Sequence, residues 1–516
     1  MRPSLRVSVV LSAMLALPAS TQQPASQQLD LIIRNGSLID GSGSPAIKAD
    51  IGIADDRIIF VGSSEGRKAK RTIDATGLIV TPGFIDPHTH TAEDLTDPKR
   101  GRNDAYLMQG VTTVVTGNDG SSPIDIRATE EKWRTQGIGT NAALFIGQGT
   151  VRHEVLGMSD AAPTDAQLDQ MRALVHAAMK AGAIGLSTGL YYAPGSYAKT
   201  EEVIELAKIA AAHGGIYDTH MRDESSYTIG LLASVEETLR IGREAHIPVM
   251  ISHIKALGAD VWGQSTQVIA MIDAARKAGV NATASQYPYT ASGTSVTASL
   301  VPRWAEANGL LLKNIDDPAV RPRLIKEMTE NMARRGGPET LLMTAAKDKT
   351  IVGKNLAQIA TERHEDPISA ALQIIQAGGS SVASFNMKED DIANFMRQPW
   401  MMTCSDGSEG HPRKYGTFPK KIHEYVEEKH VISLPAAVRS STSLTAETLG
   451  LKDRGLLKPG YFADVLVFDP KTYQDRATYE EPTVLATGVR YLTVNGKLAI
   501  DEGALTTIRA GRPLTH

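Results

Sequence analysis

Eight segments of this chain start with apolar residues and finish with polar ones, and stretches of helical periodicity separate them. The segments are GLIVTPGFIDPHTH, TTVVTGNDG, NAALFIGQG, AIGLSTGL, GGIYDTHMRD, PVMISHIKAL, NATASQYPYT and WMMTCSDGS. Eight strand–helix repeats predict an α/β fold, a (β/α)8 TIM-type barrel with its helices outside. In such barrels the catalytic groups gather at the carboxyl ends of the strands, which is where the polar residues lie here.

The stretch from 164 to 182 shows the helical pattern best. Thr164 and Gln167 predict a capping box at its start, and Gly182 lies where the helix is expected to end. One apolar face is predicted to consist of Leu168, Met171, Val175 and Met179.

The two ends of the chain have a different character, with short β-rich segments bounded by Gly and Asp turns. We expect residues 29–82 and 455–516 to pair into a small β-sandwich beside the barrel, which then spans residues 83–454. Residues from about 295 to 395 are too many for one strand–helix connection, and they predict a mostly helical insertion.

The N-terminus predicts export. A basic MRPSLR start, the short apolar run VSVVLSAMLAL, the small residues of LPAS and the polar TQQPASQQ together resemble a signal peptide and spacer over residues 1–28. The run is too short to span a bilayer, which favours a cleaved leader over an anchor and no stable membrane insertion after its removal. Cys404 is the only cysteine, so no internal disulfide forms. The expected location is the periplasm.

Composition restricts the partners. Hydrophobic residues make up 42% and charged residues 22% of the 516, as in soluble globular proteins. The formal net charge is −4, and no block of Lys or Arg stands out. This argues against nucleic acid and anionic membranes as partners, and leaves a small-molecule substrate.

Candidate metal ligands recur at the predicted strand ends. His88 and His90 lie two residues apart, so in a strand both side chains point to one face. Such a pair alone is a weak signal, because two ordinary polar strand residues give the same pattern. Similar positions end other strands, and six side chains able to bind a metal are His88, His90, Asp119, His220, His253 and Asp406.

Imidazole and carboxylate ligands together suit zinc. Zinc lowers the pKa of bound water from 15.7 to roughly 7, which makes water a nucleophile at neutral pH. A carboxylate beside it can accept the proton and pass it to a leaving nitrogen, and Asp406 is the candidate for this general acid/base role. These residues predict metal-assisted amide hydrolysis.

At these strand ends GFIDPHTH, THMRDES, ISHIKALG and SDG resemble the amidohydrolase superfamily. More closely, the chain is similar to the D-aminoacylases (N-acyl-D-amino-acid deacylases) from about residue 30 to its end. The stretches that carry this resemblance are GVTTVVTGNDG, GAIGLSTGLYYAPGSYAKTEE, YPYTA, HPRKYGTFP and GLLKPGYFADVLVFDP.

The resemblance implies a zinc enzyme that removes the acyl group from an N-acyl-D-amino acid, with metal-activated water as nucleophile. The family's metal ligands match His88, His90, His220 and His253, and its acid/base matches Asp406. The D configuration of the substrate rests on this resemblance alone.

Two departures from the family pattern concern the site. Asp119 stands where these enzymes usually carry a metal-binding Cys. Asp119 can bridge two metal ions as a harder oxygen ligand or can hydrogen-bond nearby groups, so one or two zinc ions remain open. The spacer between Asp406-Gly407 and His411 is also short for the family, which affects the pocket near Arg413.

Substrate contacts are predicted from residues near the strand ends. Lys255 faces the same way as His253 and matches the family directly, which suits binding of a substrate carboxylate. Arg413 and Arg222 are further candidates for that carboxylate, although a cation here can instead pair with Asp223, Glu224 or another structural carboxylate. The predicted walls of the pocket are Tyr191, Tyr192 and Tyr287.

Two other functions compete. A dipeptidase or a dihydropyrimidinase-like cyclic amidase commonly bridges two metals with a carboxylated Lys, and no Lys ends the fourth strand, where GLSTGL stands. A catalytically dead binding protein typically loses ligands, whereas all six positions here can bind metal.

Overall fold

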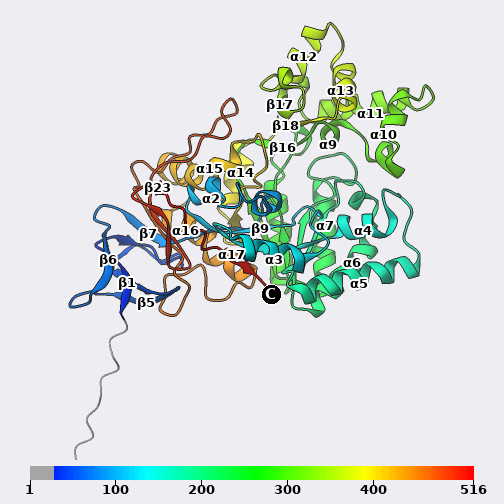
Figure 1. The fold of residues 1–516 in the computed structure, drawn as a ribbon. Helices are drawn as coiled ribbons and strands as arrows, with labels where there is room; N and C mark the ends of the chain where they lie inside the picture. The colour runs from blue at the N-terminus through cyan, green and yellow to red at the C-terminus, as the bar shows by residue number, and fades with distance from the viewer. Residues whose placement is uncertain (1–27, 516) are drawn as a thin grey trace, which may run out of the picture.

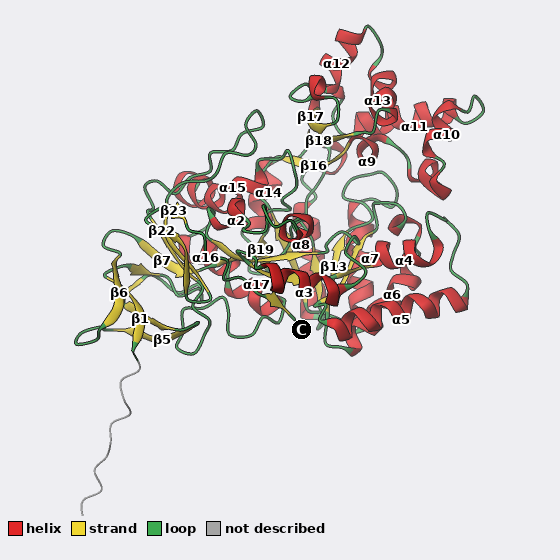
Figure 2. Cartoon of the chain, viewed as in Figure 1, coloured by secondary structure: helices red, strands yellow, loops and turns green. Residues whose placement is uncertain are grey.

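The computed structural model describes residues 28–515, in which helices and strands alternate as expected for an α/β protein (Figures 1 and 2). The predicted signal peptide and its spacer, apart from residue 28, lie outside the described residues. Within the described part of the chain, no helix has both the length and the apolar character needed to cross a membrane.

Each of the eight predicted strand segments contains a strand of a parallel sheet. These strands are β8 (Phe84–Asp86), β9 (Val111–Thr116), β10 (Asn141–Leu144), β11 (Ile146–Gly147), β12 (Gly185–Gly189), β13 (Ile216–His220), β14 (Val249–Ile251), β15 (Ala282–Gln286) and β19 (Met401–Thr403). They form two sheets, in the orders β24-β10-β9-β8 and β11-β12-β13-β14-β15-β19. Phe145 separates β10 from β11, so the third segment contributes to both sheets.

The first and last of these strands end side by side. The backbone N–H of Asp406 donates to the His88 carbonyl at 3.0 Å, and that of His90 donates to Gly407 at 3.2 Å. A parallel bridge joins Thr89 to Gly407. Residues more than 300 positions apart in the chain therefore share one edge of the sheets.

Helices cover the outer face of the parallel strands. They include α3 (Ile126–Gln136), α4 (Gln148–Leu156), α5 (Asp165–Ala181), α6 (Thr200–Ala212), α7 (Leu231–Ala245) and α8 (Ser265–Lys277). The predicted capping box of α5 is confirmed, with Thr164 and Gln167 bonded reciprocally and Gly182 at the C-cap. On its apolar face Met171, Val175 and Met179 are buried, and Leu168 packs against them half-buried.

Shorter helices fill the connections and the region after the last strand. They are α1 (Ala92–Thr96), α2 (Asp104–Leu107), α14 (Glu389–Met396), α15 (Arg413–Lys420), α16 (Leu434–Ser440) and α17 (Ser443–Thr448).

The β-rich ends of the chain meet, as Figure 1 shows in blue and red. The N-terminal strands are β1 (Leu29–Arg34), β2 (Ser37–Leu38), β3 (Ile47–Lys48), β4 (Asp50–Ala54), β5 (Arg57–Gly62), β6 (Ala69–Asp74) and β7 (Ile79–Pro82). The C-terminal strands are β20 (Val465–Phe468), β21 (Val489–Val494), β22 (Lys497–Asp501) and β23 (Ala504–Leu505). Their two sheets have the orders β5-β4-β1-β6 and β23-β22-β21-β20-β7-β2-β3, and share one apolar core.

The last residues depart from the expectation that 455–516 belongs wholly to this β-rich region. Strand β24 (Pro513–Leu514) leaves it and pairs in parallel with β10. The physical reason is an open edge: β10 pairs with β9 on one side only, and Ala142 on its other side donates to the Arg512 carbonyl at 3.0 Å.

The predicted insertion has helices, but it also contains a sheet, so its description as helical is incomplete. Strands β16 (Ala291–Ser295), β18 (Ser380–Phe385) and β17 (Leu341–Ala346) form an antiparallel sheet in that order. The helices are α9 (Val296–Leu300), α10 (Leu311–Asp316), α11 (Arg321–Arg334), α12 (Leu356–Arg363) and α13 (Pro367–Gln376). These strands are short and are paired by residues distant in the chain, so the local pattern did not reveal them. The insertion has its own core and stands at the top of Figure 1.

Candidate metal centre

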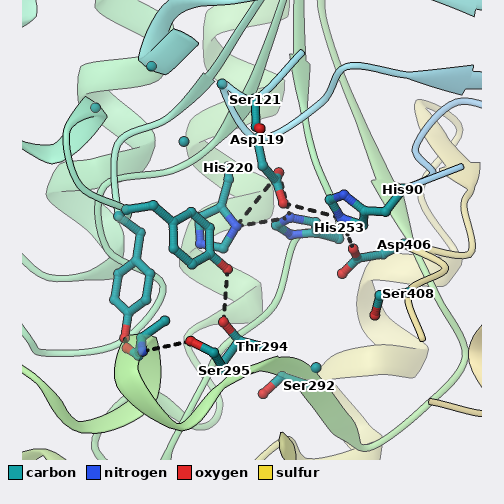
Figure 3. Close-up of a pocket in the computed structure, with 18 of the residues that line it drawn as sticks. His90, Asp119, Ser121, His220, His253, Ser292, Thr294, Ser295, Asp406 and Ser408 are labelled. Carbon is teal, nitrogen blue, oxygen red and sulfur yellow. Dashed lines mark hydrogen bonds and ion pairs between the residues drawn. The ribbon is translucent and has the colours of Figure 1, made fainter. Parts of the chain in front are cut away.

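A cavity of about 830 Å³ opens at the carboxyl ends of the parallel strands. Its floor carries the predicted ligands His90, Asp119, His220, His253 and Asp406, as Figure 3 shows. Residues of the insertion, Thr294 and Ser295 among them, line the opposite wall. The insertion therefore encloses the site that the strand ends form.

One cluster on this floor joins four side chains whose ligand atoms lie within 4.8 Å of one another: His88, Asp119, His253 and Asp406. His88 Nε2 lies 3.4 Å from Asp119 Oδ1 and 3.6 Å from Asp406 Oδ1. His90 Nε2 lies 3.1 Å from Asp406 Oδ1 and 3.5 Å from Asp119 Oδ2. The structure thus brings His88 and His90 together with both aspartates.

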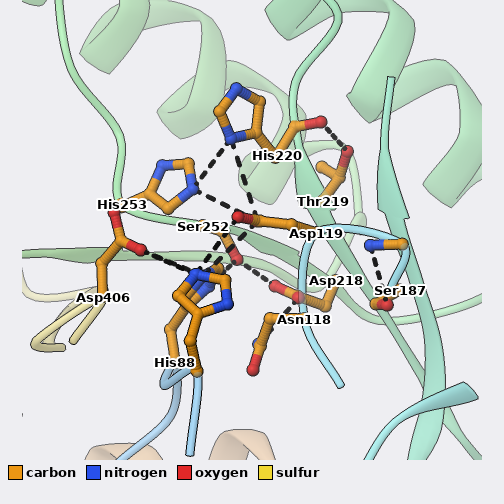
Figure 4. A network of polar contacts seen from close by, with 12 residues as sticks. His88, Asn118, Asp119, Ser187, Asp218, Thr219, His220, Ser252, His253 and Asp406 are labelled. Carbon is orange, nitrogen blue, oxygen red and sulfur yellow. Dashed lines mark hydrogen bonds and ion pairs between the residues drawn. The ribbon is translucent and has the colours of Figure 1, made fainter. Parts of the chain in front are cut away.

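A second cluster adjoins the first and shares His253 with it; its other members are His220 and Glu224. His220 Nδ1 lies 3.1 Å from His253 Nε2, and His253 Nε2 lies 3.3 Å from Asp119 Oδ1 (Figure 4). Asp119 is also 3.8 Å from His220 Nδ1. Asp119 therefore faces all four predicted histidine ligands.

The donor atoms fit a divalent cation. His88 Nε2 is buried and has no hydrogen-bond partner, so one imidazole nitrogen points into the cluster unsatisfied. His220 and His253 also direct ring nitrogens at each other, an arrangement that needs a proton or a cation between them. Imidazole nitrogens alternating with carboxylate oxygens form a ligand set for zinc.

The backbone at the cluster is strained. Asp119, His253 and Asp406 have φ angles of +55°, +35° and +47°, in the left-handed region that non-glycine residues rarely occupy. Each of them follows a strand end, and the turn directs its side chain over the carboxyl ends of the strands. Such strain persists where the surrounding structure enforces it, and it concentrates at functional sites.

Charge in the cluster keeps the two carboxylates ionised. Burial raises the pKa of Asp119, but His88 and His253 outweigh it and hold the pKa well below its usual value. Burial likewise opposes the ionised form of Asp406, and Arg413 and His253 lower the pKa of that carboxyl. Burial lowers the pKa of His220 to about 4, so its neutral ring offers a lone pair.

Polar residues beneath the cluster orient the ligands, and the sequence analysis did not single them out. His88 Nδ1 is 2.9 Å from Ser252 Oγ, which donates to Asp218, and Asn118 donates to Asp218 at 2.9 Å (Figure 4). Asp86 accepts from the backbone of His88 at 3.2 Å. The spacing in the sequence could have predicted two of these residues. Asp86 and Asp218 each lie two residues before a predicted ligand and so share its strand face.

Lys255 lines the cavity and is also paired. Its Nζ donates to Glu224 Oε1 at 2.7 Å and lies 2.7 Å from His253 Nδ1. Lys255 therefore lies in the pocket, as predicted, and also pairs with Glu224, as the alternative expected. The sequence predicts Glu224 only as a structural partner of a nearby cation, whereas in the structure Glu224 Oε2 also lies 3.6 Å from His220 Nε2.

The two predicted arginines have different positions. Arg413 lines the cavity, 1% exposed, with Nη1 2.8 Å from Asp406 Oδ2. Arg222 is not brought to the cluster: it binds Glu237 at 2.8 Å and the Ser196 carbonyl at 3.0 Å, beside a second, separate cavity. The structure thus favours the pairing alternative for Arg222, and the structural carboxylate is Glu237.

The three predicted tyrosines line the main cavity. Tyr191 stacks on the His220 ring with centroids 5.5 Å apart, and Tyr192 lies 4.8 Å from the same ring. Tyr287 has a buried hydroxyl with no hydrogen-bond partner. An unsatisfied hydroxyl in the wall of the cavity is available to a bound ligand.

Two further side chains near the last strand, His411 and Cys404, are engaged in the fold. His411 lines the cavity, but its Nδ1 accepts from the backbone of Arg413 at 3.1 Å and its Nε2 is 3.2 Å from the Ala291 carbonyl. Both ring nitrogens are therefore used in positioning the loop. Cys404 is a buried free thiol.

Comparison with known proteins gives one consistent family. A model described as the amidohydrolase family matches residues 71–500. The D-aminoacylase of Alcaligenes xylosoxydans xylosoxydans is 36% identical over 521 aligned residues, which cover 96% of this chain and 99% of the relative.

Two solved structures agree with that match. The N-acyl-D-glutamate deacylase from Bordetella bronchiseptica, complexed with zinc and a phosphonate inhibitor, has a TM-score of 0.83 at 32% identity and covers 95% of this chain and 100% of its own. A D-aminoacylase with a binuclear metal centre has a TM-score of 0.82 at 34% identity, with the same coverage.

Proposed function

The chain belongs to the amidohydrolase family and is a metal-dependent hydrolase, and we propose that it cleaves N-acyl-D-amino acids to a carboxylate and a free D-amino acid. The observation that carries this proposal is the double cluster on the cavity floor, where Asp119 faces His88, His90, His220 and His253. Proteins that match nearly the whole chain include a D-aminoacylase and an N-acyl-D-glutamate deacylase.

Zinc fits this set of donor atoms, and the residues that would hold it are His88, His90, Asp119, His220, His253 and Asp406. Zinc in this site supplies Lewis acidity, which acidifies water and polarises the amide carbonyl. Asp119 directs Oδ1 towards His88, His220 and His253 and Oδ2 towards His90, so its carboxylate could contribute to one ion position or to two. The carboxylate oxygens of Asp119 stand where the D-aminoacylases usually carry a cysteine thiolate.

Asp406 moves the proton. Arg413 Nη1 holds Asp406 Oδ2 at 2.8 Å, which leaves Oδ1 directed towards His88 and His90. From there the carboxylate accepts a proton from the attacking water and donates it to the leaving amide nitrogen. The pairing with Arg413 fixes the orientation of Asp406 for both transfers.

Lys255 and Tyr287 bind the α-carboxylate of the substrate. Lys255 Nζ lies 5.8 Å from the centre of the Tyr287 ring, so the ammonium and the unsatisfied hydroxyl belong to one wall of the cavity. The α-carboxylate is close to the scissile amide in any amino acid, so its binding group has to lie beside the metal ligands, as Lys255 does beside His253.

A cyclic-amide hydrolase receives no support from the site. Strand β12 ends in Gly189, and Lys255 is the only lysine among the described residues that line the cavity. Lys255 follows strand β14 and does not lie at the end of β12, the position expected for a bridging carboxylated lysine.

The deciding experiment measures initial rates on N-acetyl-D-methionine and its L enantiomer, with the mature protein chelated and then reloaded with zinc. We expect hydrolysis of the D form, strong preference over the L form, and loss of activity in the presence of chelator. Failure to hydrolyse either form, with zinc bound stoichiometrically, would overturn the assignment for this substrate class.

The architecture is proposed to be a closed eight-stranded barrel, residues 83–454, with the terminal sheets as a β-sandwich (29–82 and 455–516, except β24) and an insertion at about 295–395. The support for closure is the continuity of β10 and β11 around Phe145 and the backbone hydrogen bonds between the ends of β8 and β19. We propose that the predicted signal peptide, which together with its polar spacer occupies residues 1–28, directs export to the periplasm; a mature N-terminus near residue 20–28, found by mass spectrometry of the periplasmic fraction, would test this.

A further inference from the structure

Arg335 lines the cavity and lies just after helix α11 of the insertion. It is 3% exposed. Its Nε donates to the Ser299 carbonyl at 3.2 Å, and its Nη2 donates to the Tyr191 hydroxyl at 3.3 Å. Its Nη1 is buried and has no hydrogen-bond partner. One end of the guanidinium is therefore anchored and the other is unsatisfied.

The charge of Arg335 is also unbalanced. The described part of the chain buries three other arginines, and each forms an ion pair: Arg152 with Glu202, Arg413 with Asp406 and Arg454 with Asp464. Arg335 has only carbonyl and phenol partners among the described residues. A buried cation without a counter-charge is costly, and binding of an anion to Arg335 would remove this cost.

A phenol ring separates Arg335 from the metal centre. Tyr191 bonds Arg335 through its hydroxyl, and its ring stacks on the His220 imidazole at 5.5 Å. The Tyr227 ring packs on Tyr191 at 5.6 Å, and the Tyr227 hydroxyl is buried without a hydrogen-bond partner. Two unsatisfied donors thus line the same cavity, one aromatic ring away from a metal ligand.

We propose that Arg335, assisted by the Tyr227 hydroxyl, binds a second carboxylate of the substrate, and that the enzyme prefers N-acyl-D-amino acids with this additional acidic group. This inference rests on the function proposed above. The α-carboxylate is an unsuitable partner, because it is too close to the scissile amide to reach past Tyr191. The second carboxylate belongs either to an acidic side chain, as in D-glutamate, or to a dicarboxylic acyl group, as in succinyl.

The test compares substrates of the same shape that differ in charge, using the zinc-loaded full-length mature protein. One pair is N-acetyl-D-glutamate and N-acetyl-D-glutamine, and the other is N-succinyl-D-alanine and N-succinamoyl-D-alanine. We expect kcat/KM for the acid to exceed that for the amide by roughly 10- to 100-fold in one pair, as for a charge-assisted hydrogen bond. The pair that shows the preference identifies which end of the substrate reaches Arg335.

Substitutions of Arg335 and Tyr227 test whether these residues cause the preference for the acid. Arg335→Met is expected to reduce the acid-to-amide ratio to about one, and Tyr227→Phe to reduce it partly. Arg334→Met is the matched control: it removes the same charge from the neighbouring position, where Arg334 donates to Asn331 Oδ1 at 2.7 Å, and the preference should persist. If Arg335→Met does not fold, Arg335→Lys and Tyr227→Phe are measured in its place.

The outcomes separate the two proposals. Hydrolysis of N-acetyl-D-methionine and of the neutral amides without any acid preference would overturn the role of Arg335 and leave the deacylase function standing. An acid preference that the Arg335 and Tyr227 variants leave unchanged would also overturn the proposed role of Arg335. Absence of hydrolysis with every N-acyl-D-amino acid would instead reject the proposed function itself.

Discussion

Glu224 contacts two metal-ligand candidates on the side of their rings that faces away from Asp119. Its Oε1 lies 3.2 Å from His253 Nδ1 and its Oε2 lies 3.6 Å from His220 Nε2, while the other nitrogen of each ring faces Asp119. A carboxylate in this position fixes the tautomer and the orientation of a metal-binding imidazole. Here one carboxylate serves two imidazoles and is held in turn by Lys255.

Glu224→Gln is therefore expected to weaken zinc binding by roughly 10- to 100-fold, because the neutral amide no longer favours the required tautomers. Competition with a chromophoric chelator measures the dissociation constant without relying on activity. Glu154→Gln is the control, since Glu154 lines the same cavity from helix α4. Equal zinc affinity in the wild type and in Glu224→Gln would contradict this role.

Glu130, on helix α3, couples stability to pH away from the site. Burial raises the pKa of its carboxyl from 4.5 to about 7, against the opposing effect of Arg134, and its Oε1 has no hydrogen-bond partner. The folded chain therefore holds more protons than the unfolded chain between these two pH values. The contribution of Glu130 to stability is complete below pH 4.5 and is lost as the pH rises through about 7.

The variant Glu130→Gln removes this charge. We expect it to be more stable than the wild type at pH 8 by about 3 kcal/mol, since the pKa rises from 4.5 to about 7 and one pKa unit corresponds to roughly 1.4 kcal/mol, and to differ little at pH 4.5. Urea unfolding at the two pH values measures the difference. Glu131→Gln, at an exposed position paired with Arg134, should show no such pH dependence. A Glu130→Gln effect of equal size at both pH values would rule out the titration.

At the scale of the elements, strand β12 has to end in glycine. A Cβ atom at Gly189 would lie 2.2 Å from the Asp119 carbonyl oxygen, closer than any side chain tolerates. The end of the fourth strand thus leaves room for the loop that carries Asp119 to the metal ligands. This packing gives a structural reason for the glycine in GLSTGL.

Gly189→Ala is expected to displace Asp119 and to reduce kcat/KM on the order of 100-fold, because a small misplacement of a catalytic group is costly. Zinc content should fall with it. The melting temperature is measured in parallel, since crowding of a packed site costs about 1–3 kcal/mol and the fold should survive that. Full zinc content and normal kcat/KM would show that the loop adjusts without consequence.

At the scale of the whole molecule, the C-terminal tail joins the parallel sheet to the β-rich region. Gly511 donates to the Ile138 carbonyl at 2.9 Å, Ala142 donates to Arg512, and the side chain of Asn495 donates to Ala510 at 2.7 Å. These contacts cover the open edge of β10. The C-terminal residues thus add a neighbouring strand to one that lies some 370 residues earlier in the chain.

Deletion of residues 507–516 should lower the free energy of unfolding on the order of 6 kcal/mol, because at least six hydrogen bonds to the rest of the chain, each worth roughly 1 kcal/mol, are lost. The exposed edge should also promote aggregation on heating, which light scattering detects. Ile508→Ser is the control, as Ile508 is an exposed residue of the same tail. A truncated chain with the unfolding midpoint of the wild type would show that the tail is dispensable.

Local patterns were sufficient for much of the fold. The capping box at Thr164 and the strands of the eight segments were predicted correctly, because caps and strand periodicity depend on neighbours in the chain. The same periodicity put His88 and His90 on one face. Pairings between distant segments were harder: the sheet within the insertion and the return of β24 to β10 depend on which edges are left open after the rest has packed.

The sequence by itself determined the type of chemistry, since imidazoles and carboxylates at successive strand ends constrain what a parallel sheet can bind at its edge. Only the tertiary structure decided how these groups are supported and what else the cavity contains. Glu224 behind two imidazoles and Arg335 in the cavity wall leave no local pattern, because each acts through residues brought near by packing. The positions of side chains in space, and their unmet hydrogen bonds and charges, exist only once the chain has folded.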